Sequence, residues 1–595
     1  MVGNQIQVNT AVENSRLKKI RANGIIGQFF TSSQKSALRD LVNDTIFGVI
    51  SKAVAWRDRL EHIKNFPTCL GENMFYSELR HEEAGPAYHT KFYSEEPGNH
   101  YTVDFTQFKS ELLKGVSIPP DQGFELDVSE PVVLPISVTG ASLRIEKNNY
   151  NADLTYNNKR FPLHNLIQDR FYYLPLRDVG KVRVDSAHKM IVGDPIALNQ
   201  KKKHHCRLAM MIFIDNFGWD IIEHLDFDTD LPNLSKFFDK GTIFDRSYSG
   251  ANWTLPGVAT IVSGRYIKNH GMFHNWQAEK RLGQGYTTMA EYFQNDGYLT
   301  FQVCNNPRKN PAYGYTKGYD RTVFSKTMSL GESLDAMYDH LRAFPERDHF
   351  CWLTIFDAHH TLAGAPHVAN QINGTLDAQD YIAKHKKSPM ELTLDPGKTV
   401  RYIEELKRID FQLGMLFDYI EKNYNDDEFL VSVIADHGPG FLTDNPAELS
   451  HEKSHVVHMM RGTDVPVGLR VPEVVHTADV LPVFLKHAGL PAPTEEIDGR
   501  IPEGLGGPAA RDFAISEIIF PGEPYTASIK NDQYEFTFAS GGKVGDDGKF
   551  TLGSAAYQLT DLRDWKTDIS EQNPKLTEYF KSIIMDHIEP LRRDA

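Results

Sequence analysis

The chain has 595 residues, 41% of them hydrophobic and 24% charged, which is typical of a soluble globular protein with about two to four domains. Its formal net charge of −15 argues against nucleic acid as a partner. No apolar run is long enough to predict a transmembrane segment, and the N-terminal stretch lacks the apolar core of a secretory signal. Four cysteines without metal-like spacing favour a reducing compartment, so we expect a cytoplasmic protein.

The first 205 residues contain two different hydrophobic patterns, which predict two structural parts. Apolar residues recur every three or four positions between Ser33 and Ile63, a pattern typical of an amphipathic helix, so we expect residues 1–87 to form an N-terminal helical segment. Residues 88–205 alternate in short segments separated by turn residues, which predicts a small antiparallel β-sandwich. Its expected strands include 124–128, 142–145, 153–156 and 181–184. The sandwich either holds a glycan or docks on the next domain, and the basic run 201–205 predicts a solvated linker.

From residue 206 the pattern is that of an α/β domain. Three apolar runs, 208–214, 350–356 and 429–435, are typical of parallel strands buried on both faces. Each run ends in polar groups: Asp215-Asn216, then Asp357 followed by His359 and His360, then Asp436-His437. Ligands bind beyond the carboxyl ends of strands in open α/β sheets. A single aspartate there is usually a turn or cap residue, but three of them favour a metal or acid–base site.

Asp215, Asp436 and His437 offer two carboxylates and one imidazole. This set suits Mn²⁺, Zn²⁺ or Mg²⁺, whereas Ca²⁺ prefers more oxygen ligands. We therefore expect a divalent metal cofactor, with Mn²⁺ or Zn²⁺ preferred.

Thr254 precedes Pro256, at the predicted start of a helix over residues 257–262. A threonine there is either an ordinary helix cap or part of an anion site at the positive end of the helix. A nearby metal would favour the second interpretation, since coordination activates a hydroxyl as a nucleophile. Thr254 would then be both nucleophile and metal ligand.

Several histidines and polar residues are further candidates. His359 or His360, together with one of the histidines in SHEKSHVVH (His451, His455 and His458), would fill a second metal site or protonate a leaving group. We take His359 and His451 as catalytic candidates. Further residues for metal or substrate binding are Asn216, Asp357, His360, His455, Asn252 and Lys453.

The order of these motifs resembles the sulfatase-like branch of the alkaline phosphatase superfamily. The resemblance runs from about Arg207 to the C-terminus and includes TLPGVATIVSGRYIKNHG, ADHG and the segment HTADVLPVFLKHAGLP. It implies a mainly parallel sheet between helices over residues 206–510, and a C-terminal subdomain over 511–595. The expected fold class is therefore α/β, with the helical segment and the β-sandwich in front.

Departures from the family pattern indicate a branch. Sulfatases carry C/S-x-P-S-R, whose first residue becomes formylglycine. The matching residues here are Thr254-Leu255-Pro256-Gly257-Val258, and threonine cannot give that aldehyde. The family's G-K-W-H stretch is absent, and Asn216 stands where sulfatases usually have a second aspartate. The middle strand has histidines two and three residues after Asp357 rather than the D-x-x-x-H of two-metal phosphodiesterases.

With a threonine as its nucleophile, the chain instead resembles the family's phosphodiesterases and its phosphoethanolamine or phosphoglycerol transferases. The resemblance implies Asp215, Thr254, Asp436 and His437 as metal ligands. We thus expect a hydrolase of phosphodiesters or phosphonate monoesters that works through a phospho-threonine intermediate. The alternatives are a soluble transferase acting on a glycan, a sulfatase, and a non-catalytic scaffold. The expected partner is a phosphate ester, free or glycan-linked, and a homo-oligomer contact through the N-terminal helix stays open.

Overall fold

The structure is a computed structural model. It describes residues 90–94, 101–105, 110–139, 150–166, 171–273, 282–283, 285–309, 311–325, 328–359 and 394–593. The expected helical segment 1–87 and the expected strand 142–145 lie outside these residues. None of the described helices combines the length and the apolarity that crossing a bilayer requires.

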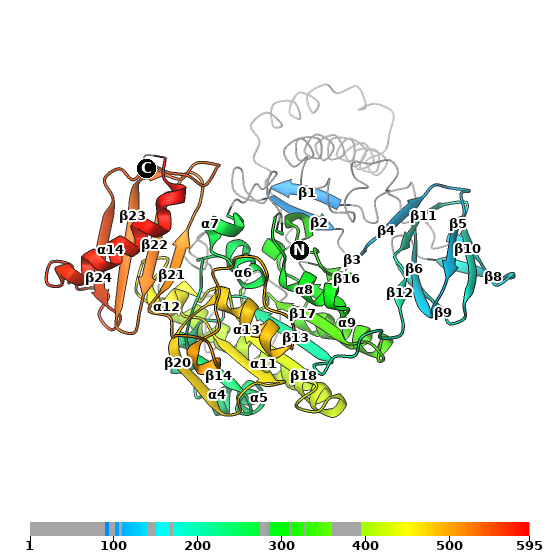
Figure 1. Cartoon of the computed structure of the whole chain (residues 1–595), viewed down its shortest axis with the longest axis horizontal. Coiled ribbons are helices and arrows are strands. Elements are labelled where there is room, and N and C mark those ends of the chain that lie inside the picture. The colour runs from blue at the N-terminus through cyan, green and yellow to red at the C-terminus, as the bar shows by residue number, and fades with distance from the viewer. Residues whose placement is uncertain are drawn as a thin grey trace, which may run out of the picture. The chain divides into compact units, whose positions relative to one another are not determined.

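A nine-stranded sheet forms the centre of the described chain (Figure 1). Its strands are, in spatial order, β20 (Leu469–His476), β14 (Thr242–Tyr248), β19 (His458–Gly462), β18 (Phe429–Ile434), β13 (Leu208–Ile214), β17 (His349–Ile355), β15 (Leu299–Cys304), β16 (Arg321–Phe324) and β3 (Ser110–Leu113). β13 runs parallel to both of its neighbours, β17 and β18. Only β19 and β3 pair antiparallel with the strands beside them.

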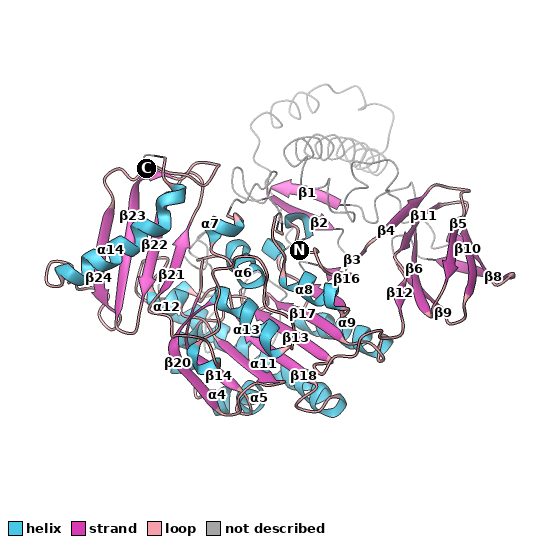
Figure 2. Ribbon diagram, in the orientation of Figure 1, coloured by secondary structure: helices cyan, strands magenta, loops and turns pink. Residues whose placement is uncertain are grey.

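The central strands are apolar throughout because both of their faces are covered. Met210 and Ile212 of β13 belong to one buried cluster, while Met211 and Phe213 belong to another. The first cluster includes residues of α5 (Pro232–Phe238), α9 (Leu330–Ala343) and α11 (Pro396–Asn423); the second includes residues of α6 (Thr254–Ser263), α8 (Met289–Asp296) and α13 (Val480–His487). Figure 2 shows these helices around the sheet. The expected α/β fold, a mainly parallel sheet between helices, is confirmed.

The edge strand β3 comes from a part of the chain that we expected to form only the sandwich. It pairs with β16 so that Leu113 lies opposite Arg321. Leu112 is fully buried, and the short strand covers an edge of β16 that would otherwise present unpaired backbone groups. Four residues of the segment 88–205 therefore belong to the central sheet, which the alternating pattern of that segment did not indicate.

Two antiparallel sheets follow β3 in the chain. One has the order β5 (Phe124–Val128), β10 (Gly180–Asp185), β7 (Tyr150–Tyr156), β8 (Lys159–Leu166); the other has β12 (Ile196–Ala197), β6 (Val132–Thr139), β11 (Lys189–Gly193), β4 (Gly115–Ile118), with β9 (Tyr172–Leu176) also paired to β6. Alternate residues of both sheets, such as Val182 of β10 and Ile136 of β6, share one hydrophobic cluster. Three of the expected strands coincide with β5, β7 and β10 or lie within them.

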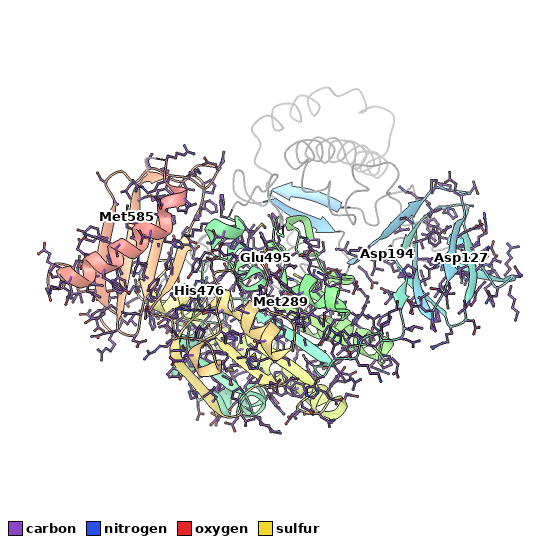
Figure 3. The ribbon with its side chains drawn as sticks, in the orientation of Figure 1. Asp127, Asp194, Met289, His476, Glu495 and Met585 are labelled. Carbon is purple, nitrogen blue, oxygen red and sulfur yellow. The ribbon has the colours of Figure 1, made fainter. Side chains whose placement is uncertain are left out.

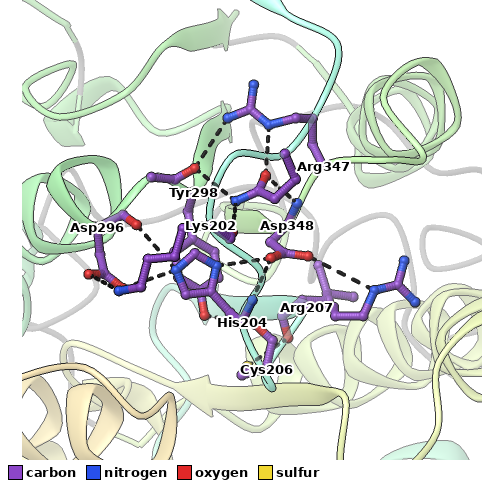
Figure 4. Close-up of polar contacts among 11 residues, drawn as sticks. Lys202, His204, Cys206, Arg207, Asp296, Tyr298, Arg347 and Asp348 are labelled. Carbon is purple, nitrogen blue, oxygen red and sulfur yellow. Dashed lines mark hydrogen bonds and ion pairs between the residues drawn. The ribbon is translucent and has the colours of Figure 1, made fainter.

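The basic run after the sandwich is only partly solvated. Lys202 is largely exposed, but the side chain of His204 is 6% exposed. His204 Nδ1 lies 2.9 Å from Asp348 Oδ2 and its Nε2 lies 3.0 Å from Asp296 Oδ2, while its ring stacks on Tyr298 (Figure 4). The expectation of a solvated linker is therefore wrong at His204, because two carboxylates and an aromatic ring compensate for its burial.

A four-stranded antiparallel sheet ends the chain. It comprises β21 (Ala514–Ile518), β22 (Pro524–Lys530), β23 (Tyr534–Lys543) and β24 (Ala556–Asp561), and α14 (Pro574–Ile588) lies across one face (Figure 1). His476, at the end of β20, lies at the junction with the central sheet (Figure 3), where its Nε2 donates to the carbonyl of Ile515 at 2.9 Å. This bond joins the last sheet to the central one.

Candidate active site

Thr254 is the first residue of α6. The preceding residue, Trp253, has an extended backbone and occupies the cap position, and no side chain caps the helix. Instead of capping, the Thr254 hydroxyl donates to Asp215 Oδ2 at 3.0 Å. Thr254 is 2% exposed, so this hydroxyl is held at the positive end of a helix and against a carboxylate. The interpretation of Thr254 as an ordinary helix cap does not fit this geometry.

Asp215 and Asp436 follow the parallel strands β13 and β18, and both are fully buried. Asp215 Oδ1 and Asp436 Oδ2 accept no hydrogen bond from any described residue. Burial raises the pKa of both carboxyls, and the charge of Asp436 adds to the effect on Asp215. Two buried, incompletely bonded carboxylates side by side are costly unless a cation lies between them.

Two imidazoles complete the cluster. His437 Nε2 lies 3.4 Å from Asp436 Oδ2 and 3.9 Å from Asp215 Oδ1. His359 Nε2 lies 3.9 Å from the same Asp215 oxygen. Asp215, His359 and His437 each place one ligand atom within 4.8 Å of the others. The structure thus brings His359, from the end of β17, to the two strand ends that carry the carboxylates.

Asn216 adds a buried amide to the same place. Its φ of +67° is a left-handed conformation that asparagine tolerates better than most residues. In this conformation its backbone N–H donates to Asp436 Oδ1 at 3.3 Å, and its carbonyl accepts from Tyr402 at 2.7 Å. Neither side-chain atom of Asn216 has a hydrogen-bond partner among the described residues.

These donors fit a divalent metal. Asp215 Oδ1, Asp436 Oδ2 and Asn216 Oδ1 are buried oxygen atoms without a hydrogen-bond partner among the described residues. His437 supplies a nitrogen 3.4 Å from Asp436 Oδ2. A mixed set of carboxylate, amide and imidazole ligands suits Mn²⁺, Zn²⁺ or Mg²⁺. Thr254 lies within one hydrogen bond of the set.

Asn306, a residue that the sequence did not indicate, also contacts Asp215. It follows β15, two strands from β13 in the sheet order, and its side-chain amide donates to Asp215 Oδ2. Asn306 is fully buried. Its sequence signals were a polar Asn-Asn pair directly after an apolar strand and its place in the stretch that stands where the family has G-K-W-H.

Asp357 does not join the cluster, contrary to expectation. Its Oδ1 accepts from Arg408 at 2.6 Å and from the backbone N–H of Leu330, at the start of α9, at 3.2 Å. Its Oδ2 accepts from Asn305 at 2.9 Å. Both carboxylate oxygens are therefore occupied, and Asp357 ties the end of β17 to α9 and α11.

His451 and His455 line a cavity of about 710 Å³. His451 Nδ1 is 3.0 Å from the Tyr248 hydroxyl, and His455 Nε2 donates to the carbonyl of Asp245 at 2.8 Å. Within the described residues, neither ring contacts Asp215 or Thr254. The single turn α12 (His451–Ser454) directs both rings toward β14, and burial lowers the pKa of His455 to about 4. The structure thus separates them from the carboxylate cluster.

The remaining candidates make other contacts or lie outside the described residues. Asn252 donates to Glu448 at 2.7 Å, a contact that sequence reasoning missed. Lys453 is buried, burial lowers its pKa, and its backbone carbonyl accepts from Gly438 in the turn after His437. His360 lies outside the described residues.

Residues 207–490 match the family model of the sulfatases. They form a sulfatase-family domain. This match places that domain, rather than the chain as a whole, in the sulfatase-like alkaline phosphatase superfamily, as its motifs predicted.

Individual relatives of the sulfatase-family domain are distant. Arylsulfatase G of Mus musculus is 24% identical over 147 residues, a match that covers 23% of this chain and 28% of the relative's length. A phosphonate monoester hydrolase of Silicibacter pomeroyi is similar with a TM-score of 0.51 at 17% identity, covering 64% of this chain and 95% of that one. A candidate sulfatase of Bacteroides thetaiotaomicron gives 0.50 at 14%, covering 65% and 93%. At these identities the structural likeness describes the fold.

Gly257 and Val258, in the first half of α6, differ from the sulfatase-family signature. Val258, at the position of the signature arginine, is fully buried in the apolar cluster that contains α6, α8 and α13. Gly257 faces Asp436, and a Cβ on Gly257 would lie 3.0 Å from the Cβ of Asp436. A side chain at residue 257 would crowd the carboxylate, and an arginine at 258 would point into the core.

Proposed function

We propose that this sulfatase-family domain is a metal-dependent phosphoric-ester hydrolase with Thr254 as its nucleophile. One observation carries the proposal. The Thr254 hydroxyl, at the start of a helix, donates to Asp215 in a cluster whose carboxylates keep oxygens without partners. A hydroxyl beside such a cluster is placed for activation, whereas a structural threonine would bond to the backbone.

The residues that would hold the metal are Asp215, Asp436, His437 and Thr254, with Asn216 as a further ligand. When bound, a divalent cation lowers the pKa of a coordinated hydroxyl and withdraws charge from phosphoryl oxygens. The first turn of α6 adds backbone N–H groups without helical acceptors, which favour the negative charge on a transferring phosphoryl group.

The chemistry divides into two displacements. Thr254 Oγ passes its proton to Asp215 Oδ2, to which it is hydrogen-bonded, and attacks phosphorus. The bond from phosphorus to the leaving oxygen breaks, and the departing alkoxide takes a proton. His359 is our candidate for supplying that proton, since its Nε2 lies in the carboxylate cluster, 3.9 Å from Asp215 Oδ1. Water then attacks phosphorus of the phospho-threonine and the bond from phosphorus to Thr254 Oγ breaks. A phosphodiester substrate thus yields a phosphate monoester and a phosphonate monoester yields a phosphonate, while Thr254 Oγ recovers its proton. Attack by a sugar hydroxyl at this step would make the enzyme a transferase.

A sulfatase is the second candidate, and the family match over residues 207–490 favours it. Against it, threonine cannot be oxidised to the aldehyde of formylglycine, and Val258 replaces the signature arginine with a core side chain. A sulfatase built on this chain would have to use the threonine hydroxyl itself. We therefore rank phosphorus esters first.

The test is an ester panel on the purified full chain. The substrates are p-nitrophenyl phosphate, bis-p-nitrophenyl phosphate, a p-nitrophenyl phenylphosphonate and p-nitrophenyl sulfate, each with Mn²⁺ or Zn²⁺ and after chelation. We expect cation-dependent turnover of a phosphorus ester that is abolished in Thr254→Ala. Turnover of the sulfate above every phosphorus ester would refute the choice of substrate, and no turnover of any ester would favour the scaffold alternative.

A second measurement separates hydrolase from transferase. Glycerol or an oligosaccharide is added as acceptor, and the products are analysed by mass for a transferred phosphoryl group. We expect free phosphate or phosphonate as the main product. A phosphorylated acceptor as the main product would assign the chain to the transferases.

A further inference from the structure

One oxygen of Asp215 receives two donors while the other receives none. Thr254 Oγ1 and Asn306 Nδ2 both donate to Oδ2. Oδ1 accepts no hydrogen bond from a described residue and lies 3.9 Å from Nε2 of both His359 and His437. The two donors thus fix the rotation of the carboxylate, and Oδ1 faces the imidazoles.

The side-chain amide of Asn306 is itself oriented. Its Oδ1 accepts the backbone N–H of Arg308 at 2.8 Å. An amide has one acceptor end and one donor end, so this bond directs the NH₂ group to Asp215. The orientation therefore follows from the hydrogen-bond network rather than from the shape of the side chain.

The loop that carries Asn306 is anchored below the site. The Asn306 carbonyl accepts from the backbone N–H of Lys309 at 3.2 Å, which closes the turn η2 (Pro307–Lys309). The Lys309 side chain is 2% exposed, with its ammonium 4.9 Å from the centre of the Trp352 ring and hydrogen-bonded to Gln302. A buried cation in an aromatic enclosure gives the loop little freedom to move.

We propose that Asn306 is a positioning residue for the active site. It holds Asp215 so that one carboxylate oxygen binds the Thr254 hydroxyl and the other stays available to a divalent cation. The inference rests on the proposed function. Hydrogen bonds that orient metal ligands usually matter to affinity almost as much as the ligands do.

The neighbouring Asn305 provides a matched control. It occupies the same strand end and is also buried, at 2% exposure. Its amide donates to Asp357 and to the carbonyl of Met328, and its oxygen accepts from the backbone of Phe356. The Asn305 side chain thus makes three hydrogen bonds, against two for the Asn306 side chain, and none of the three reaches Asp215.

The experiment measures binding of Mn²⁺, and separately Zn²⁺, to the cation-stripped full chain by calorimetry without substrate. We expect Asn306→Leu to weaken cation binding by roughly 10- to 100-fold and Asn305→Leu to leave it within about twofold. Asn306→Ala is the second variant, in case leucine is not accommodated. Thermal unfolding of each variant without cation identifies any general loss of structure.

A double-variant cycle with Thr254→Val distinguishes positioning from simple packing. Since both donors hold the same oxygen, we expect the double variant to lose more affinity than the product of the two single losses. Independent, purely multiplicative losses would overturn the inference, as would equal affinity of Asn306→Leu and the unaltered chain. If the unaltered chain binds neither cation, the proposed function fails together with the inference; if it binds and only Asn306→Leu is without effect, the proposed function stands.

Discussion

Two neighbouring strands of the central sheet are each followed by an aspartate, but the two carboxylates differ in their hydrogen bonds. Asp215, after β13, has an oxygen without a hydrogen-bond partner and a neighbour, Asp436, in the same condition. Asp357, after the adjacent strand β17, has both oxygens occupied by Arg408, Asn305 and a backbone N–H. Asp215 and Asp357 both lie at the carboxyl edge of the sheet. This position alone therefore does not show which of the two aspartates belongs to the metal site.

The difference lies in what compensates each buried charge. A guanidinium from α11 stabilises Asp357, which makes that carboxylate part of the scaffold. No described cationic side chain other than the imidazoles lies within ion-pair distance of Asp215 or Asp436. Charge compensation there is left to something from outside the chain, which is the condition of a metal site.

We expect the largest effect, a loss of turnover, from replacement of Thr254. Thr254→Val keeps the shape of the side chain but removes the nucleophile, so we expect turnover of phosphorus esters to fall by roughly 10³-fold or more. The measurement is kcat on the best ester of the panel at saturating cation. Thr254→Ser, which keeps a hydroxyl, is the control and should retain part of the activity. Activity of the valine variant within tenfold would place the reaction elsewhere.

The two groups of histidines offer the next contrast. His359 is in the carboxylate cluster, whereas His451 is in the cavity beside Tyr248. We expect His359→Gln to lower kcat by about 10²-fold, in the range for loss of a general acid, and His451→Gln to change it less than twofold. The ratio of the two kcat values is the measurement. Equal losses would show that the cavity of His451 takes part in the reaction.

Substitution of Asp436 and substitution of Asp357 should change the free energy of unfolding in opposite directions. In cation-free protein at neutral pH, Asp436→Asn removes one of two adjacent buried charges, so we expect the free energy of unfolding to rise by about 1–2 kcal/mol. Asp357→Asn breaks the contact with Arg408, so we expect it to fall by about 2 kcal/mol. Denaturant unfolding measures both. A loss of stability in both variants would mean that Asp436 is compensated within the chain.

The architecture was predictable where neighbouring residues decide it. Continuous apolar runs fixed the places of β13, β17 and β18, because a strand buried on both faces needs apolar side chains at every position. The helix expected over residues 257–262 is present as α6, which begins three residues earlier, at Thr254, with Pro256 in its first turn. The motif order also gave the correct family.

The site was less predictable where distant residues decide it. Asn306 is 91 residues from Asp215 in the chain, and Arg408 is 51 residues from Asp357. No local pattern says which strand-end aspartate will meet a guanidinium and which will meet an amide. The alternation of residues 88–205 likewise gave no sign that β3 crosses to the central sheet, since a short edge strand resembles any other.

The pH dependence of cation binding gives the smallest expected effect and the most direct test of the unpaired carboxylates. Burial raises the pKa of Asp215 and Asp436 above the values of the unfolded chain. In cation-free protein their contribution to stability is therefore complete below about pH 4, the unfolded pKa, and is lost as the pH rises through the folded values. A cation must displace the protons that remain, so its affinity increases over the same pH window.

We expect the rise in melting temperature on adding Mn²⁺ to grow as the pH is raised above about 4, with a limit of about 1.4 kcal/mol per pH unit for each proton displaced. Scanning calorimetry with and without Mn²⁺ at each pH measures the increment. Asp436→Asn should flatten this dependence because it removes one titrating carboxyl, whereas Lys407→Met, which breaks an ion pair with Asp230 on α4 (Phe227–Asp230), should not. An increment that is independent of pH would mean that the carboxylates are already ionised without the cation, and the distinction between Asp215 and Asp357 would lose its electrostatic basis.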